Sequence, residues 1–356
     1  MTRRAFIKTV AGAASGAVMT GESAWRAPDE SARHTRTFMQ WPVNRRVHDD
    51  ADFLHDLQGA VARIANAVSA FEPVVMLMGR AHEPAARTRL GGAVEIWDVA
   101  TDDLWCRDSG PLFVVDGRGG LAVSHIQFNG WGGKQAHSAD AAVAAEAARR
   151  LGVRLIERGL VGEAGGVESD GAGTLIAHES CWINPNRNRE PKATVEARLL
   201  DAYGARKMIW APGVKDADIT DYHIDALARF VEPGVVLIQM PDRLDSADPW
   251  SRAAFETHAI LSEARDADGR RLRLERAPEP RRTRVRSDDF VASYVNYYVC
   301  NGAVIAARFG DRDTDKEAQA TLARLYPGRE VVMLNVDAIG EAGGGIHCAT
   351  QQQPAA

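Results

Sequence analysis

Residues 51–78 read ADFLHDLQGAVARIANAVSAFEPVVMLM, and this stretch indicates how the whole chain is built. Between Ala51 and Ala70, apolar residues recur at three- and four-residue steps, which is the spacing of one buried face of a helix. Pro73 ends that pattern, and the apolar run Val74–Met78 then predicts a buried strand. The stretch therefore encodes a helix followed by a strand.

The same order of helix and strand recurs four more times along the chain. The further predicted helices span residues 138–151, 191–203, 249–264 and 314–326, and the strands after them begin near residues 153, 207, 272 and 331. A glycine, or an Asp-Gly or Pro-Gly pair, follows each of these helices and predicts its end. A short strand at Thr37–Trp41, ended by Pro42, precedes the first helix.

Predicted hairpins lie between the helices. Two apolar runs that flank Asp-Gly or Asn-Gly indicate a hairpin, because the tight turn needs positive φ. The predicted turns are Asp116-Gly117, Asp170-Gly171, Pro233-Gly234 and Asn301-Gly302, the last between predicted strands at residues 295–299 and 303–306. A doubly wound parallel sheet would not need these hairpins. We therefore predict an α/β fold of about five strand-strand-helix-strand modules in a cyclic arrangement, in which distant segments meet at one central axis.

Composition and charge exclude some classes of protein. The chain has 356 residues, of which 45% are hydrophobic and 26% charged, so it is long enough to bury a large core in one or two domains. A net charge of −5 argues against a general nucleic-acid binder, and we interpret the arginine-rich run 270–286 as a solvated loop. The four cysteines form no CxxC pair and no zinc-type spacing with histidine, so we expect no structural metal.

The N-terminus resembles an export signal of the twin-arginine type. Thr2–Lys8 contains an arginine pair followed by Phe6, and an Ala/Gly-rich run continues to about Thr20. That run is too short to span a bilayer stably, so we expect no stable membrane insertion. We predict that residues 1–30 are signal and linker, with an open cleavage position, and that residues 31–356 form one domain. The protein would be periplasmic or secreted, or cytoplasmic if the signal is not functional.

Each predicted module carries a polar cluster beside its strands. The clusters are Trp105–Pro111 with Phe128–Gly132, Glu163–Gly166 with Asn184–Asn188, Thr220–Asp225, Ser293–Tyr297, and Gly343–Gln351. Single members have structural alternatives: Asp108 could pair with an arginine, and His223 could be a satisfied core histidine. Because the clusters recur in step with the modules, we expect them to meet in one site.

The chemistry of these clusters suggests a nucleophilic thiol. Cys348 follows three glycines, which let the backbone come close to a ligand; the alternative is a flexible tail with a buried structural cysteine. His223 and Asp225 are two residues apart, so on a strand both would face the same side. A thiol, a histidine and several carboxylates without metal ligands indicate covalent catalysis by a thiolate.

The surplus of carboxylates predicts the substrate class. Two aspartates around a reacting carbon imply a cationic substrate, and a planar cation with several N–H donors pairs best with two carboxylates. A guanidinium group fits this description. The ring of Trp105 or Trp131 could stack on it.

Six motifs occur in this chain in a fixed order. They are Trp-x-Arg-Asp-x-Gly-Pro at 105–111, Phe-Asn-x-Trp-Gly at 128–132, Asn-Pro-Asn-Arg-Asn at 184–188, His-x-Asp at 223–225, Ser-Tyr-x-Asn at 293–296, and Gly-rich-Ile-His-Cys-x-Thr-Gln-Gln at 343–352. Together they resemble the agmatine deiminase family, which includes the porphyromonad-type peptidylarginine deiminases. The resemblance covers nearly everything after the leader. It implies a catalytic deiminase domain with the five-bladed α/β propeller of pseudo-fivefold ββαβ modules found in the guanidino-group modifying superfamily.

The resemblance also implies residue roles. Cys348 would attack the guanidinium carbon, Asp108 and Asp225 would hold its nitrogens, His223 would protonate the departing ammonia and then activate water, and Glu163 would orient the histidine. Further substrate-binding residues would be Trp105, Trp131 and Asn296. A covalent thiouronium would form and hydrolyse to a ureido product, without a cofactor. With agmatine, as in putrescine biosynthesis, the products would be N-carbamoylputrescine and ammonia.

Two other functions stay open, and three residues depart from the family pattern. An exported peptidylarginine deiminase would convert arginine residues to citrulline, and a non-catalytic propeller would only bind guanidino ligands. The expected partner is thus a small cationic guanidino substrate or peptidyl arginine, with no nucleic acid, in a chain that could form a homodimer. Ala164 and Ala342 replace family glycines, and Gly345 replaces an asparagine, which bears on substrate specificity.

Overall fold

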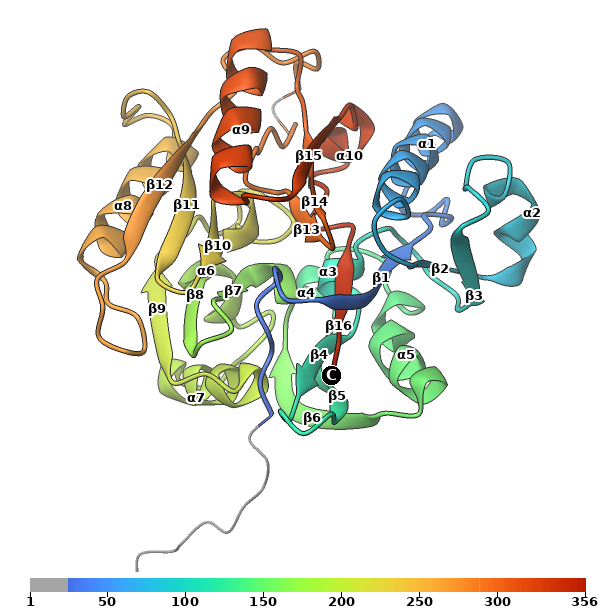
Figure 1. The fold of residues 1–356 in the computed structure, drawn as a ribbon, viewed down its shortest axis with the longest axis horizontal. Coiled ribbons are helices and arrows are strands. Elements are labelled where there is room, and N and C mark those ends of the chain that lie inside the picture. The colour runs from blue at the N-terminus through green and yellow to red at the C-terminus, as the bar shows by residue number, and fades with distance from the viewer. Residues whose placement is uncertain (1–24, 288) are drawn as a thin grey trace, which may run out of the picture.

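The computed structural model describes residues 25–287 and 289–356, and Figure 1 shows their arrangement. Residues 1–24, which carry most of the predicted export signal, lie outside the described residues. Within the described part of the chain, no helix combines the length and the apolar character needed to cross a membrane.

Four three-stranded sheets repeat one pattern within the described residues. In each, the first two strands form an antiparallel hairpin and the third runs parallel to the second. The sheets are β4 (Leu112–Val115), β5 (Leu121–Gln127) and β6 (Arg154–Val161); β7 (Val167–Ser169), β8 (Thr174–His178) and β9 (Lys207–Ala211); β10 (Ala228–Glu232), β11 (Val235–Met240) and β12 (Arg273–Pro278); and β13 (Tyr298–Cys300), β14 (Ala303–Ala307) and β15 (Glu330–Leu334). The hairpins therefore form where the turn signals predicted them.

A fifth sheet joins the two ends of the described chain. Its order is β16 (Gln351–Pro354), β1 (His34–Gln40), β2 (Val74–Met78) and β3 (Val94–Asp98), with β16 antiparallel to β1. Cys348 lies just before β16. The paired strand excludes the alternative of a flexible C-terminal tail.

One main helix precedes the third strand of each three-stranded sheet, and another precedes β2 in the fifth sheet. These helices are α1 (Ala51–Val68), α5 (Val143–Leu151), α7 (Lys192–Tyr203), α8 (Pro249–Glu263) and α9 (Arg312–Leu325), and Figure 1 shows them at the outside of the molecule with the sheets further in. Local chemistry sets their ends: the Asp50 side chain accepts hydrogen bonds from two N–H groups at the start of α1, and Gly204, with φ 64°, ends α7. The predicted mixed α/β class is confirmed.

Short helical segments occupy several of the connections. They are η1 (Arg80–His82), α2 (Glu83–Ala86), α3 (Cys106–Ser109), α4 (Gly130–Gly133), η2 (Asp140–Ala142), η3 (Ala164–Gly166), α6 (Glu179–Trp182), η4 (Ile224–Ala226) and α10 (Asp337–Glu341). Several of them, notably α3, η3 and η4, carry residues from the predicted polar clusters.

Two local predictions are wrong. The strand expected at residues 295–299 begins only at Tyr298, because the preceding residues turn so that the Asn296 side chain can bond to the backbone of the Cys348 loop. The arginine-rich run 270–286 is not wholly a loop, since β12 lies within it and pairs with β11. Within the strand, the buried Ala277 and the partly buried Leu274 pack against the core among the arginines.

Residues 25–30 belong to the folded body, although we expected them to be linker. The backbone of Arg26 exchanges two hydrogen bonds with Val115, at 3.0 and 2.9 Å, and the Ala27 N–H donates to the carbonyl of Tyr203 at 3.0 Å. Ala27 is buried. The segment therefore bonds both to strand β4 and to the end of helix α7.

Candidate active site

The predicted catalytic residues come from equivalent places in the five sheets. Each lies in the connection just before the first strand of a sheet: Asp108 before β4, Glu163 before β7, His223 and Asp225 before β10, and Cys348 before β16. Asn296 holds the same place before β13. The repeat therefore brings five distant connections to one place, as the sequence predicted.

Cys348 lies in a buried, acidic environment. Its Sγ receives a hydrogen bond from Asn296 Nδ2 at 3.2 Å and lies 3.5 Å from Asp225 Oδ2. The residue is 9% exposed. Burial, together with the charges of Asp225 and Asp108, raises the pKa of the Cys348 thiol well above its usual range. In the free protein this group is therefore a thiol.

Two buried carboxylates each have one held oxygen and one free oxygen. Asp108 Oδ2 accepts a hydrogen bond from Trp131 Nε1 at 3.0 Å, and Asp225 Oδ2 lies 2.7 Å from His347 Nδ1. The other oxygen of each, Oδ1, is buried and has no hydrogen-bond partner among the described residues. A buried carboxylate oxygen without a hydrogen bond is costly, so Asp225 Oδ1 points to a missing donor, and so does Asp108 Oδ1, which has only an ion pair with His223 at 3.6 Å.

His223 lies between two acids. Its Nε2 is 3.2 Å from Glu163 Oε2, and its Nδ1 is 3.6 Å from Asp108 Oδ1. Burial works to lower the pKa of His223, but Asp108, Glu163 and Asp225 outweigh it and raise the pKa to about 9. Burial, helped by Asp225 and Glu163, raises the pKa of Asp108 to about 6 despite the nearby histidine. At neutral pH the pair is an imidazolium beside a carboxylate.

The backbone around His223 differs from the predicted strand. Ile224–Ala226 form the 3-10 helix η4, and the two residues before His223, Asp221 and Tyr222, have φ of 61° and 70°. Such angles are uncommon for residues other than glycine. The expectation that a strand aligns His223 with Asp225 is therefore wrong, and a tight left-handed turn positions them instead.

Gly165 gives these side chains the space to meet. A Cβ atom at this position would lie 2.6 Å from Asp108 Oδ1, 2.9 Å from His223 Nδ1 and 3.3 Å from Asp225 Oδ2. All three distances are shorter than an ordinary van der Waals contact. The catalytic groups therefore surround a position that only glycine fits without displacement.

The other predicted substrate-binding residues, Trp131, Trp105 and Asn296, contact residues around the site. Trp131, besides its bond to Asp108, has φ 54° and is buried. The ring of Trp105 lies against Gly344, where an added Cβ would collide with it. Asn296 Oδ1 accepts from the N–H of His347 at 2.9 Å and so supports the loop that carries the thiol.

Sequence reasoning missed a group of charged residues behind the site. Arg187 is fully buried and donates from Nε to Glu163 Oε1 at 3.0 Å and from NH1 to Asp221 Oδ2 at 2.6 Å. Asp221 also accepts from Lys134 Nζ at 3.0 Å. The motif at 184–188 contains Arg187 and could have drawn attention to it, but the motif does not indicate which carboxylates Arg187 contacts. His347 was likewise quoted within a motif without a role.

Two of the departures from the family pattern lie against supporting residues of the site. Ala164 lines a cavity behind the site, together with Arg229 and His347. An added Cβ at Gly345 would collide with Asn296 Oδ1. Within the described residues, no group of three or more His, Cys, Asp or Glu residues could hold a metal ion.

Comparisons with known proteins agree with this geometry. Residues 26–354 match the family described as Porphyromonas-type peptidyl-arginine deiminase. The agmatine deiminase of Stutzerimonas stutzeri is 37% identical over 354 residues, covering 92% of this chain and 95% of that protein. That of Pseudomonas aeruginosa is 35% identical over 359 residues, covering 93% and 96%. The structure of agmatine deiminase from Enterococcus faecalis superposes with a TM-score of 0.86 at 26% identity, covering 93% of this chain and 96% of that one. The chain therefore belongs to the family of agmatine deiminases and Porphyromonas-type peptidyl-arginine deiminases.

Proposed function

We propose that this protein is a hydrolase of C–N bonds in linear amidines, which deiminates a small guanidino substrate of the agmatine type and releases ammonia. The two free carboxylate oxygens, Asp108 Oδ1 and Asp225 Oδ1, carry the proposal. Both are buried beside the Cys348 thiol, and a guanidinium offers the planar set of N–H donors that two carboxylates accept best. The agmatine deiminases among the relatives support the same substrate class.

The bound cation also supplies the activation that the thiol lacks. Burial and two carboxylates keep the pKa of Cys348 high in the empty site. A guanidinium between Asp108 and Asp225 would neutralise those charges and favour the thiolate, because a nearby positive charge stabilises an anion. Substrate binding and formation of the nucleophile are then coupled.

The reaction follows in two balanced steps. Cys348 Sγ forms a bond to the guanidinium carbon, His223 gives a proton to one nitrogen, and the C–N bond breaks to release ammonia and leave a covalent thiouronium. Water then loses one proton to His223 and forms a C–O bond to the same carbon. The C–S bond breaks to return the thiolate, and the remaining hydroxyl proton passes to the released ammonia, which becomes ammonium. Agmatine and water would give N-carbamoylputrescine and ammonium, and no step needs a cofactor.

A second candidate is deimination of arginine in peptides, which the family name and the predicted export signal favour. The burial of the reacting groups favours a small substrate instead. Cys348 is 9% exposed, His223 is 4% exposed and Asp225 has no exposed surface. A peptide backbone would need a wider approach to the thiol.

We also propose that the five sheets are the blades of a pseudo-fivefold propeller. The repeated strand order supports this, as does the common position of the site residues before each first strand. The agmatine deiminase of known structure that superposes over 93% of this chain supports it as well.

The test is ammonia release by the purified chain, with Cys348→Ala as the blank. Agmatine, free arginine and a peptide with C-terminal arginine are offered in parallel at equal concentration. Release from agmatine alone is expected. Release mainly from the peptide would replace the first candidate by the second. Binding of all three without release would show a non-catalytic guanidino-binding protein.

A further inference from the structure

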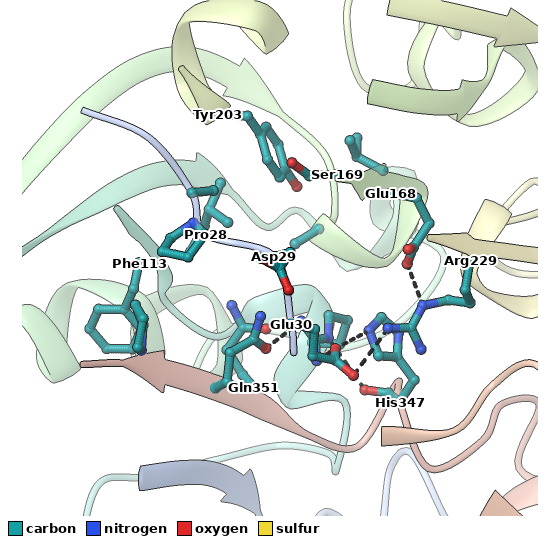
Figure 2. Close-up of a pocket in the computed structure, with 17 residues that line it drawn as sticks. Pro28, Asp29, Glu30, Phe113, Glu168, Ser169, Tyr203, Arg229, His347 and Gln351 are labelled. Atoms are coloured by element: carbon teal, nitrogen blue, oxygen red, sulfur yellow. Dashed lines mark hydrogen bonds and ion pairs between the residues drawn. The ribbon is translucent and has the colours of Figure 1, made fainter. Parts of the chain in front are cut away.

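The segment Trp25–Glu30 is built into the rear of the site, and Figure 2 shows part of it. Besides its backbone bonds to Val115 and Tyr203, the segment lies against two glycines: Gly171 in the β7–β8 turn and Gly204, which ends α7. An added Cβ at Gly204 would collide with the carbonyl of Trp25, and one at Gly171 would collide with the backbone N of Asp29. Both glycines also have φ of 64°, a conformation that favours glycine, so a larger residue would be disfavoured at either position.

Glu30 ends this segment beside a small cavity of about 50 Å³ that lies behind the site. Its carboxylate has four partners: Oε1 accepts from the N–H of Val299 at 2.8 Å and pairs with Arg229 at 3.0 Å, and Oε2 accepts from Arg107 NH2 at 2.9 Å and lies 2.8 Å from His347 Nε2. Figure 2 shows Glu30 and Arg229 directed toward His347. Although burial opposes them, Arg229, His347 and Arg107 hold the pKa of Glu30 well below its usual range.

His347 links this carboxylate to the site. Its Nε2 faces Glu30 and its Nδ1 faces Asp225 Oδ2 at 2.7 Å, with the ring almost fully buried. Glu30 thereby orients the ring so that Nδ1 faces Asp225 Oδ2, and the ring in turn fixes which oxygen of Asp225 is held.

Because His347 bonds to one carboxylate oxygen of Asp225, the other oxygen is the one left for a substrate. With Oδ2 bonded to His347 and close to the Cys348 thiol, Asp225 keeps Oδ1 without a partner. Glu30 also pairs with Arg107, whose backbone N–H donates to the Cys348 carbonyl at 3.0 Å. One carboxylate thus supports both the thiol loop and the substrate-holding aspartate.

We propose that Glu30 is a positioning residue of the reaction, acting through His347 on Asp225. The inference rests on the proposed function. It assigns a role in the site to the segment that directly follows the predicted leader.

The test compares Glu30→Gln with Asp29→Asn, its neighbour. Both changes remove one charge from the same segment, but among the described residues the Asp29 side chain bonds to Ser31, two residues further on, and not to the site. Loss of a partner that orients a functional histidine costs about 10- to 100-fold in activity in metal sites, and we expect a fall of that size in kcat/KM for Glu30→Gln. Asp29→Asn should keep wild-type kcat/KM. Equal activity of the two variants would overturn the proposal.

A double-mutant cycle separates positioning from loss of fold. If Glu30 acts through His347, Glu30→Gln should add less than about 2-fold to the loss caused by His347→Gln, whereas independent residues give multiplying losses. Full multiplication, with thermal unfolding midpoints that match wild type, would overturn the proposal. If Glu30→Gln does not fold, Glu30→Asp, which keeps the charge but falls short of His347, takes its place in the cycle with the same expectation.

The pH profile gives a further readout. Besides burial, which raises it, the groups that face Asp225 and lower its pKa are His347, His223 and Arg229, with the hydrogen bond from His347 first. Weakening that hydrogen bond in Glu30→Gln should raise the pKa of Asp225, so that kcat/KM falls more steeply with acid below the limb that Asp108 sets than it does in wild type. An unchanged slope would overturn the proposal. A wild-type protein that releases ammonia from no guanidine would instead defeat the proposed function itself, so the two failures are distinguishable.

Discussion

Replacing Gly165 by alanine tests the geometry of the site with one methyl group. Gly165 is not among the glycines with positive φ, so alanine can adopt its backbone conformation without strain. The new Cβ would lie 2.6 Å from Asp108 Oδ1, which is 0.8 Å less than the 3.4 Å at which ordinary contact begins. The same atom would lie 2.9 Å from His223 Nδ1.

The neighbours cannot move aside freely. Asp108 is held by Trp131 through its other oxygen, and His223 is held by Glu163. A displacement approaching 1 Å at reacting groups costs about 100-fold in rate, equivalent to about 2.7 kcal/mol. We therefore expect Gly165→Ala to lower kcat/KM by about 100-fold. Overpacking should also cost about 1–3 kcal/mol of folding stability, which a thermal unfolding scan measures.

The control is Gly92→Ala, in an exposed turn where an added Cβ meets nothing within 4 Å. It carries the same change of residue and should keep both kcat/KM and the unfolding midpoint. Wild-type ammonia release by Gly165→Ala would refute the reasoning, because it would mean that Asp108 and His223 do not need their present places.

Three further predictions concern the reacting groups. Cys348→Ala should abolish ammonia release yet still bind agmatine in a calorimeter, and any remaining turnover would contradict the thiol mechanism. The kcat/KM profile should rise as Asp108 ionises near pH 6 and fall as His223 loses its proton near pH 9; a flat profile over that range would remove both groups from the rate. Trp131→Phe keeps an aromatic ring but removes a donor that lowers the pKa of Asp108, so the acid limb should move to higher pH, measured against wild type in the same buffers.

The meeting of the predicted catalytic residues could be anticipated from the sequence, because their polar clusters recur in step with the modules. Their roles came from the resemblance of six motifs taken together, since Cys348 or His223 alone fits a structural role as well. The supporting residues were not predictable in this way. Glu30 and His347 are 317 positions apart, and no pattern in either stretch names the other.

The wrong prediction at His223 has a physical cause. A His-x-Asp spacing fits a strand, and nothing in the sequence warns that Asp221 and Tyr222 adopt positive φ, which both residue types usually avoid. Buried tertiary contacts maintain that turn: Asp221 Oδ2 is held by Arg187, and the Tyr222 ring stacks on His178 with centroids 4.7 Å apart. Here tertiary contacts from other parts of the chain outweigh the backbone preference of the local sequence.

The departures from the family pattern bear on the shape of the site more than on its chemistry. Ala164 lines the small cavity beside Glu30 and His347. It is the next residue, Gly165, whose added Cβ would meet carboxylate oxygens of Asp108 and Asp225. Gly345 lies against Asn296, which holds the thiol loop through backbone contacts. Neither position carries one of the groups proposed to form or break bonds. Those groups lie in motifs that match the family pattern, so a difference in substrate preference would come from the walls around them.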